Sequence, residues 1–91
     1  MYKAHDFVSS NEEKINKEVN EFIERFNANI QKTGYLQGRY DIKYCPEGVL
    51  EIVTFRIKNK LLAAGWIFSY SVDFYNNRFE FKVFLDKSDI I

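Results

Sequence analysis

Apolar and polar residues alternate on both sides of Asn76-Asn77, and this pattern predicts a β-hairpin. One alternating run extends from Ile67 to Tyr75 and the other from Arg78 to Leu85. Alternation with a period of two is typical of a strand that buries one face. Asparagine tolerates a positive φ angle, so the two asparagines suit a two-residue hairpin loop. This loop predicts four apolar pairs across the strands, all on one face: Phe74–Phe79, Val72–Phe81, Tyr70–Val83 and Phe68–Leu85.

Apolar residues recur with a helical period between residues 10 and 32, and we predict a long amphipathic helix there. Ser10 and Glu13 have the spacing of a capping box, in which each side chain bonds to the backbone of the other residue. Gly34 follows the last apolar residue and suits the left-handed conformation that ends many helices. The apolar stripe of this helix consists of Ile15, Val19, Phe22, Ile23, Phe26 and Ile30.

Residues 39–45 alternate after a loop at 34–38, and we predict a half-buried strand there. A further short strand is expected at residues 2–8, close to the N-terminus. The residues of the first of these strands that we expect to face the core are Tyr40, Ile42 and Tyr44.

The segment 47–64 has two interpretations. As a helix, it begins at Pro46, ends before Gly65 and contains a run of strong helix formers. As a strand, residues 49–57 supply the Val, Ile, Thr and Phe side chains that favour sheets. We prefer the helix, because a strand would break in the middle of the apolar pattern. The helical stripe consists of Leu50, Val53, Ile57, Leu61 and Ala64.

In chain order these elements are (β)-α-β-α-β-β, which predicts a two-layer α/β (α+β) sandwich with two helices on one face of a three- or four-stranded sheet. The 91 residues suit a single domain over 1–91, and the 46% of hydrophobic residues exclude a disordered chain. No apolar run is long enough to cross a membrane, and no signal peptide is visible. A single cysteine excludes an internal disulfide, so we expect a cytoplasmic protein.

Residues 5–44 resemble the Cse60-like family of small sporulation proteins. The likeness rests on His-Asp-Phe at 5–7, an acidic helix with Asn-Glu-Phe-Ile at 20–23, and Tyr-Asp-Ile-Lys-Tyr at 40–44 as a strand. It covers less than half of the chain and leaves out the second helix and the hairpin. The resemblance implies no activity, so it assigns no site residues.

Few residues offer reactive chemistry, and we expect neither an enzyme nor a metal or cofactor site. His5 is the single histidine, and the neighbouring Asp6 would point to the opposite face of a strand. Cys45 precedes a predicted helix N-terminus, where a thiol pKa can fall, but a buried free cysteine is the commoner role. Asp73 and Glu80 would face each other across the hairpin, and a solvated pair of carboxylates is the simpler interpretation.

The second helix carries a further apolar stripe on the side opposite its core stripe. A helix with two apolar faces is either buried on both sides or meets a partner. We therefore predict a small non-enzymatic protein that binds another protein, or itself as a homodimer; cover by flanking segments is the alternative. Its small size and its Lys-, Asn-, Ile-, Phe- and Tyr-rich composition suggest a phage- or mobile-element-encoded regulator or inhibitor of a host protein. The predicted contact residues are Ile52, Phe55, Arg56, Asn59 and Leu62.

The balance of charge bears on the alternative functions. The chain has 13 basic and 13 acidic residues, which argues against a general polyanion binder. A single-stranded nucleic-acid module remains as an alternative, in which Tyr75 and Phe84 stack on bases with Arg78 and Lys82 beside them on the open sheet face. A small-ligand-binding or sequestering protein is a further alternative, with no residue pattern behind it.

Overall fold

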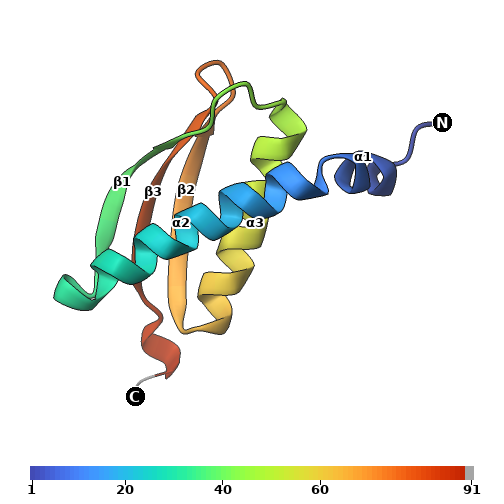
Figure 1. Ribbon diagram of the computed structural model, residues 1–91. Helices are drawn as coiled ribbons and strands as arrows, with labels where there is room; N and C mark the ends of the chain where they lie inside the picture. The colour runs from blue at the N-terminus through green and yellow to red at the C-terminus, as the bar shows by residue number, and fades with distance from the viewer. Residues whose placement is uncertain (90–91) are drawn as a thin grey trace.

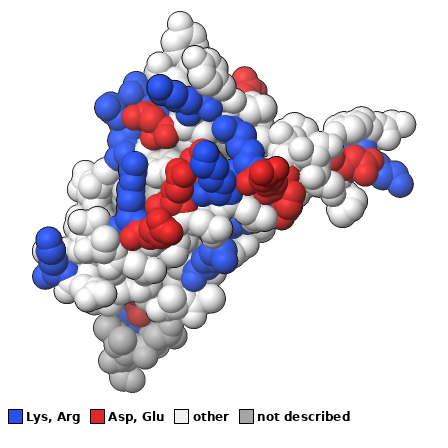
Figure 2. Space-filling view, in the orientation of Figure 1, with Lys and Arg blue, Asp and Glu red and all other residues white. Residues whose placement is uncertain are grey.

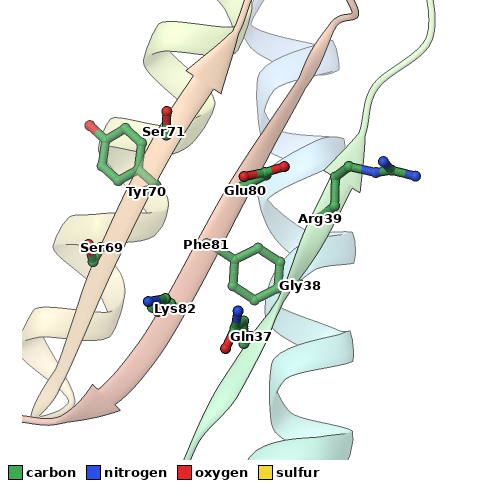
Figure 3. A pocket seen from close by; sticks show the side chains of 9 residues that line it. All are labelled: Gln37, Gly38, Arg39, Ser69, Tyr70, Ser71, Glu80, Phe81 and Lys82. Atoms are coloured by element: carbon green, nitrogen blue, oxygen red, sulfur yellow. The ribbon is translucent and has the colours of Figure 1, made fainter.

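Two long helices cover one face of a three-stranded antiparallel sheet in the computed structural model, which describes residues 1–89 (Figure 1). This confirms the predicted two-layer α+β arrangement. The view from the other side of the sheet shows both helices behind the strands (Figure 3). In chain order the elements are α1 (Ala4–Ser10), α2 (Glu12–Thr33), β1 (Leu36–Asp41), α3 (Glu47–Ala63), β2 (Trp66–Asp73), β3 (Arg78–Leu85) and the short 3₁₀ helix η1 (Lys87–Asp89).

The strand order is β1-β3-β2, so β3 lies at the centre and both other strands form edges. Because β1 and β2 each pair antiparallel with β3, they run parallel to one another. The β1–α3–β2 unit is therefore a split β-α-β motif with β3 inserted between its strands. At one end, the backbone N–H of Ile42 donates to the carbonyl of Asn77 at 2.8 Å and joins the β1–α3 loop to the hairpin loop.

The hairpin forms as predicted, but its register differs from the prediction by two residues. Val72 lies opposite Phe79, and Asp73 lies opposite Arg78. The loop therefore has four residues, 74–77, because the Asp73 carboxylate accepts hydrogen bonds from the backbone N–H and side-chain amide of Asn76, at 3.2 and 2.8 Å. A shift of two residues keeps every side chain on its predicted face.

The N-terminal strand prediction for residues 2–8 is wrong, because this segment forms the helix α1. The capping box is absent as well. The Ser10 hydroxyl donates to the carbonyl of Asp6 and the Asn11 amide donates to the carbonyl of Phe7, both at 2.9 Å. These side chains therefore bond backward to the end of α1 and do not cap α2.

The N-terminal helix docks on the start of α3 through a glycine. A Cβ atom at Gly48 would lie 2.7 Å from the ring of Phe7, closer than such atoms approach. Phe7 and Val8 are partly buried against the core, but α1 has no fully buried residue. In Figure 1 this helix extends away from the rest of the molecule, and the space-filling view shows it as a projection (Figure 2).

The two long helices confirm the predicted 10–32 and 47–64 segments within a few residues, and the strand alternative for 49–57 is wrong. Gly34 has φ 69°, the left-handed conformation that we predicted at the end of α2. Phe22 lies at the centre of the core. Its ring is 5.0 to 5.7 Å from four aromatic rings of the sheet, centroid to centroid, and these belong to Tyr40, Phe68, Phe79 and Phe81.

The first strand begins and ends earlier than the predicted 39–45, and it includes Gly38. Tyr40 and Ile42 are buried as predicted, but Tyr44 is 91% exposed, with φ 51°, and does not face the core. Gly38 faces the helices and lies opposite Phe81 (Figure 3). A Cβ atom added to this glycine would lie 3.4 Å from the Phe81 ring. The aromatic ring thus covers the glycine and stabilises the strand there.

Candidate functional site

The predicted outer stripe of α3 is exposed along most of its length. Phe55 is 55% exposed, Leu62 is 48% exposed, and Asn59 between them is exposed as well. The spacing of these three residues places them on one face of the helix, and we call them the α3 outer stripe. Ile52 lies on the same side of the helix but is partly buried against the core, so only part of its side chain is available to a partner.

Arg56 is engaged within the chain. Its guanidinium donates to both carboxylate oxygens of Glu12 on α2, at 2.8 and 3.0 Å, and to the side-chain oxygen of Asn16 at 3.1 Å. This pairing lowers the pKa of Glu12 and raises that of Arg56. Arg56 therefore connects the two long helices, and the exposed stripe lies beside this link.

The four residues predicted for nucleic-acid binding are not brought together. Tyr75 lies in the hairpin loop and is 93% exposed, whereas Phe84 lies near the far end of β3. Arg78 and Phe84 are six residues apart on one strand, which corresponds to about 20 Å. Arg78 is also flanked by two carboxylates, at 3.9 Å from Asp41 and 3.6 Å from Asp73.

The open face of the sheet is polar, with charges of both signs. A shallow hollow of about 500 Å³ lies on it, and Figure 3 labels the residues that line it. Arg39 on β1 lies opposite Glu80 on β3, and Lys82 follows Glu80 on the same face of β3. Basic and acidic side chains are therefore neighbours in the hollow. On the helical side as well, basic and acidic side chains are interleaved over the body of the molecule (Figure 2). The face drawn in Figure 2 does not carry the single basic surface that a polyanion requires.

The structure buries Cys45 and gives Asp73 and Glu80 different cross-strand partners. Cys45 is buried and its thiol donates to the carbonyl of Pro46 at 3.3 Å; burial raises the pKa of this thiol, which disfavours the reactive thiolate. The prediction that Asp73 and Glu80 face each other is wrong, because the register places Ser71 opposite Glu80. Over residues 1–89, no group of three or more acidic, His or Cys side chains is placed to hold a metal ion. No helix of that part of the chain is long and apolar enough to cross a membrane.

A cleft between α2 and β1 was missed by the sequence reasoning. It has a volume of about 240 Å³. Its floor is apolar, and it opens beside Arg25, whose guanidinium lies 5.1 Å from the centre of the Tyr40 ring. The Tyr40 hydroxyl donates to the Glu18 carboxylate at 3.1 Å, and burial together with this carboxylate raises the pKa of Tyr40. The residues that line it come from α2, β1 and β3, so only the folded chain brings them together.

Comparison of the chain with protein-family models, with curated proteins and with solved structures found no match. These comparisons do not test the resemblance of residues 5–44 to a sporulation family, which stays a prediction.

Proposed function

We propose that the chain is a non-enzymatic protein-binding domain whose contact surface is centred on the α3 outer stripe. The observation that carries this proposal is the exposure of Phe55 and Leu62 on a helix whose opposite side is completely buried. Folding alone explains the buried side and leaves the outer stripe without a role. Large apolar side chains on an otherwise polar helix face are typical of a contact surface.

The size of the stripe limits how it binds. Two half-exposed side chains contribute roughly 2–3 kcal/mol together when a partner buries them. A micromolar complex requires about 8 kcal/mol. The stripe is therefore the centre of a larger contact, with Asn59 and the exposed residues around it completing the surface.

A homodimer is one form of this contact. Two copies of α3 packed antiparallel across a two-fold axis would place Phe55 of each copy on Leu62 of the other. Such a pairing doubles the apolar area that the stripe buries. A groove on a different protein is the other form, in which the helix supplies anchors one and two turns apart.

The test compares Phe55→Glu/Leu62→Glu with wild type and with the control Asn20→Glu/Asn27→Glu. The control makes the same change of charge at exposed positions on the outer face of α2. Sedimentation equilibrium over a range of concentrations measures self-association, and tagged capture followed by mass spectrometry measures binding of other proteins. Circular dichroism verifies that each variant folds.

We expect wild type and the α2 control to dimerise or to retain the same captured protein, and the α3 variant to lose that association. A wild-type chain that stays monomeric and captures the same proteins as the α3 variant contradicts the proposal. The narrower hypothesis of a phage- or mobile-element-encoded inhibitor rests on size and composition. It is tested by identifying any protein that wild type and the α2 control capture but the α3 variant does not, and by measuring whether the chain inhibits that protein.

A further inference from the structure

The outer edge of β1 has unused backbone hydrogen-bonding capacity. β1 pairs with β3 on one side only, and within residues 1–89 no loop or side chain bonds to the backbone of Leu36–Asp41 on the other. Exposed N–H and C=O groups on an edge strand are a template for a further strand. The edge formed by β2 is similarly unpaired, so an additional feature is needed to choose between them.

That feature is the cleft beside β1, which offers an apolar space of limited size. Its floor consists of Phe22, Phe26, Leu36 and Phe81. Leu36 and Tyr40 border this space on β1, and the Phe81 ring covers Gly38 between them. At about 240 Å³ the cleft is smaller than the ~300–1,000 Å³ of typical small-molecule sites. It therefore suits one or two apolar side chains of a longer chain better than a whole ligand.

The charges at the mouth of the cleft are of one sign. Arg25 and Arg39 line it, and no carboxylate does. In the described part of the chain neither guanidinium forms an ion pair, although Glu80 is the cross-strand neighbour of Arg39. Figure 3 shows Arg39 extending past the edge of β1, away from Glu80. Two carboxylates of α2, Glu18 and Glu21, accept from the hydroxyl of Tyr40, which also lines the cleft.

We propose that the groove between β1 and α2 binds an extended acidic peptide, which adds to the sheet as a fourth strand beside β1. Side chains of an added strand alternate between the two faces of the sheet. Those opposite Gly38 enter the cleft and are apolar. Those beside Arg39 point to the open face and are acidic, and Arg25 draws a further carboxylate to the mouth of the cleft. This site is separate from the α3 outer stripe and does not depend on it.

The first experiment is selection of binders from a yeast-displayed library of random octapeptides on the full chain. We expect enrichment of sequences that alternate apolar and acidic residues. An absence of enriched sequences, or enrichment of basic ones, overturns the proposal. The most enriched octapeptide is then synthesised with blocked ends and a fluorescent label, and its affinity is measured by fluorescence anisotropy.

Protein variants locate the binding site of that octapeptide. We expect Arg25→Glu/Arg39→Glu to lower the affinity by about tenfold or more. The control Lys17→Glu/Lys32→Glu reverses two charges at other exposed positions of α2 and should leave it within about twofold. Leu36→Trp enlarges a side chain that lines the cleft and should abolish binding while circular dichroism remains that of a folded chain. Equal affinity for the arginine variant and its control overturns the proposed site.

A backbone modification tests the binding mode. Methylation of alternate backbone nitrogens on one edge of the octapeptide removes the donors that strand addition needs, whereas methylation on the other edge leaves them. We expect only one of the two methylated octapeptides to bind. Equal binding of both overturns strand addition. Phe55→Glu/Leu62→Glu should keep full affinity for the octapeptide. Octapeptide binding therefore tests the proposed groove separately from the proposed contact surface on α3.

Discussion

The two long helices pack against the same sheet but differ in what their outer faces carry. α2 buries its apolar stripe and presents Glu, Lys and Asn to solvent, so the needs of folding account for nearly all of its sequence. α3 buries six residues and still presents Phe55 and Leu62 on its outer side. Both outer faces are exposed to the same solvent. Burial in the core therefore does not account for Phe55 and Leu62, and this difference directs the search for function to α3.

The largest expected difference between the two helices is in the free energy of unfolding that each loses when one of its aromatic rings is removed. Phe22→Ala leaves a cavity beneath four aromatic rings and should lower the free energy of unfolding by about 3–5 kcal/mol. Phe55→Ala removes a ring that is already half solvated and should change that free energy by less than about 0.5 kcal/mol. Urea denaturation followed by circular dichroism measures both.

Phe22→Leu serves as a milder variant in case the alanine variant does not fold. It should fall between the other two, because it leaves a smaller cavity. A loss for Phe55→Ala as large as that for Phe22→Leu would show that the outer ring of α3 is internally covered. In that case the contrast between the helices, and with it the proposed contact surface, would be lost.

A second, smaller effect concerns the polar contact that joins α2 to β1. The pKa of Tyr40 is raised in the folded chain above its usual value of 10.0. Above about pH 10 the unfolded chain therefore holds fewer protons than the folded chain, and stability falls as pH rises through this range. Below it, the contribution is fully present. Tyr40→Phe has no phenol to ionise at this position. Above about pH 10, wild type should therefore lose free energy of unfolding relative to this variant.

Because other tyrosines and lysines titrate in the same range, the relevant quantity is the difference between the two chains at each pH. At neutral pH we expect Tyr40→Phe to be less stable by about 1 kcal/mol, since it lacks the hydrogen bond to Glu18. A difference that stays constant from about pH 8 to about pH 11 would show that the phenol ionises equally easily in both states. Urea denaturation at matched ionic strength provides the comparison.

The fold was largely predictable because its long elements bury regular stripes. Leu50, Val53 and Ile57 have spacings of three and four, which a helix places on one side and a strand divides between its two faces. The hairpin faces were also predictable, since alternation fixes them. The register was not, because the carboxylate of Asp73 holds a four-residue loop and two registers differing by two residues bury the same face.

The site was less predictable for related reasons. Phe55 and Leu62 were found because a helical wheel shows the outer stripe directly. Arg56 was placed in that surface, but its partner Glu12 is 44 positions away in the sequence and only the folded chain brings them together. The cleft beside β1 was missed because residues 34–38 were assigned to a loop, whereas Leu36 and Gln37 line the cleft from a strand.

The smallest expected effect comes from the ion pair that links the outer sides of the two helices. The pKa of Glu12 is lowered by its hydrogen bonds to Arg56, so the carboxylate is more acidic in the folded than in the unfolded chain. The stability that it contributes is fully present above its unfolded value of about 4.5 and is lost as pH falls below that value. Glu12→Gln keeps the shape of the side chain and removes the charge. We expect it to be slightly less stable than wild type at about pH 7, and we expect this difference to shrink as pH falls below about 4.5, as measured by urea denaturation.

Salt provides the control for this ion pair. Both partners are partly exposed, so added salt should shrink the difference between Glu12→Gln and wild type at neutral pH. A difference that persists unchanged in acid would mean that Glu12 acts through packing and not through its charge.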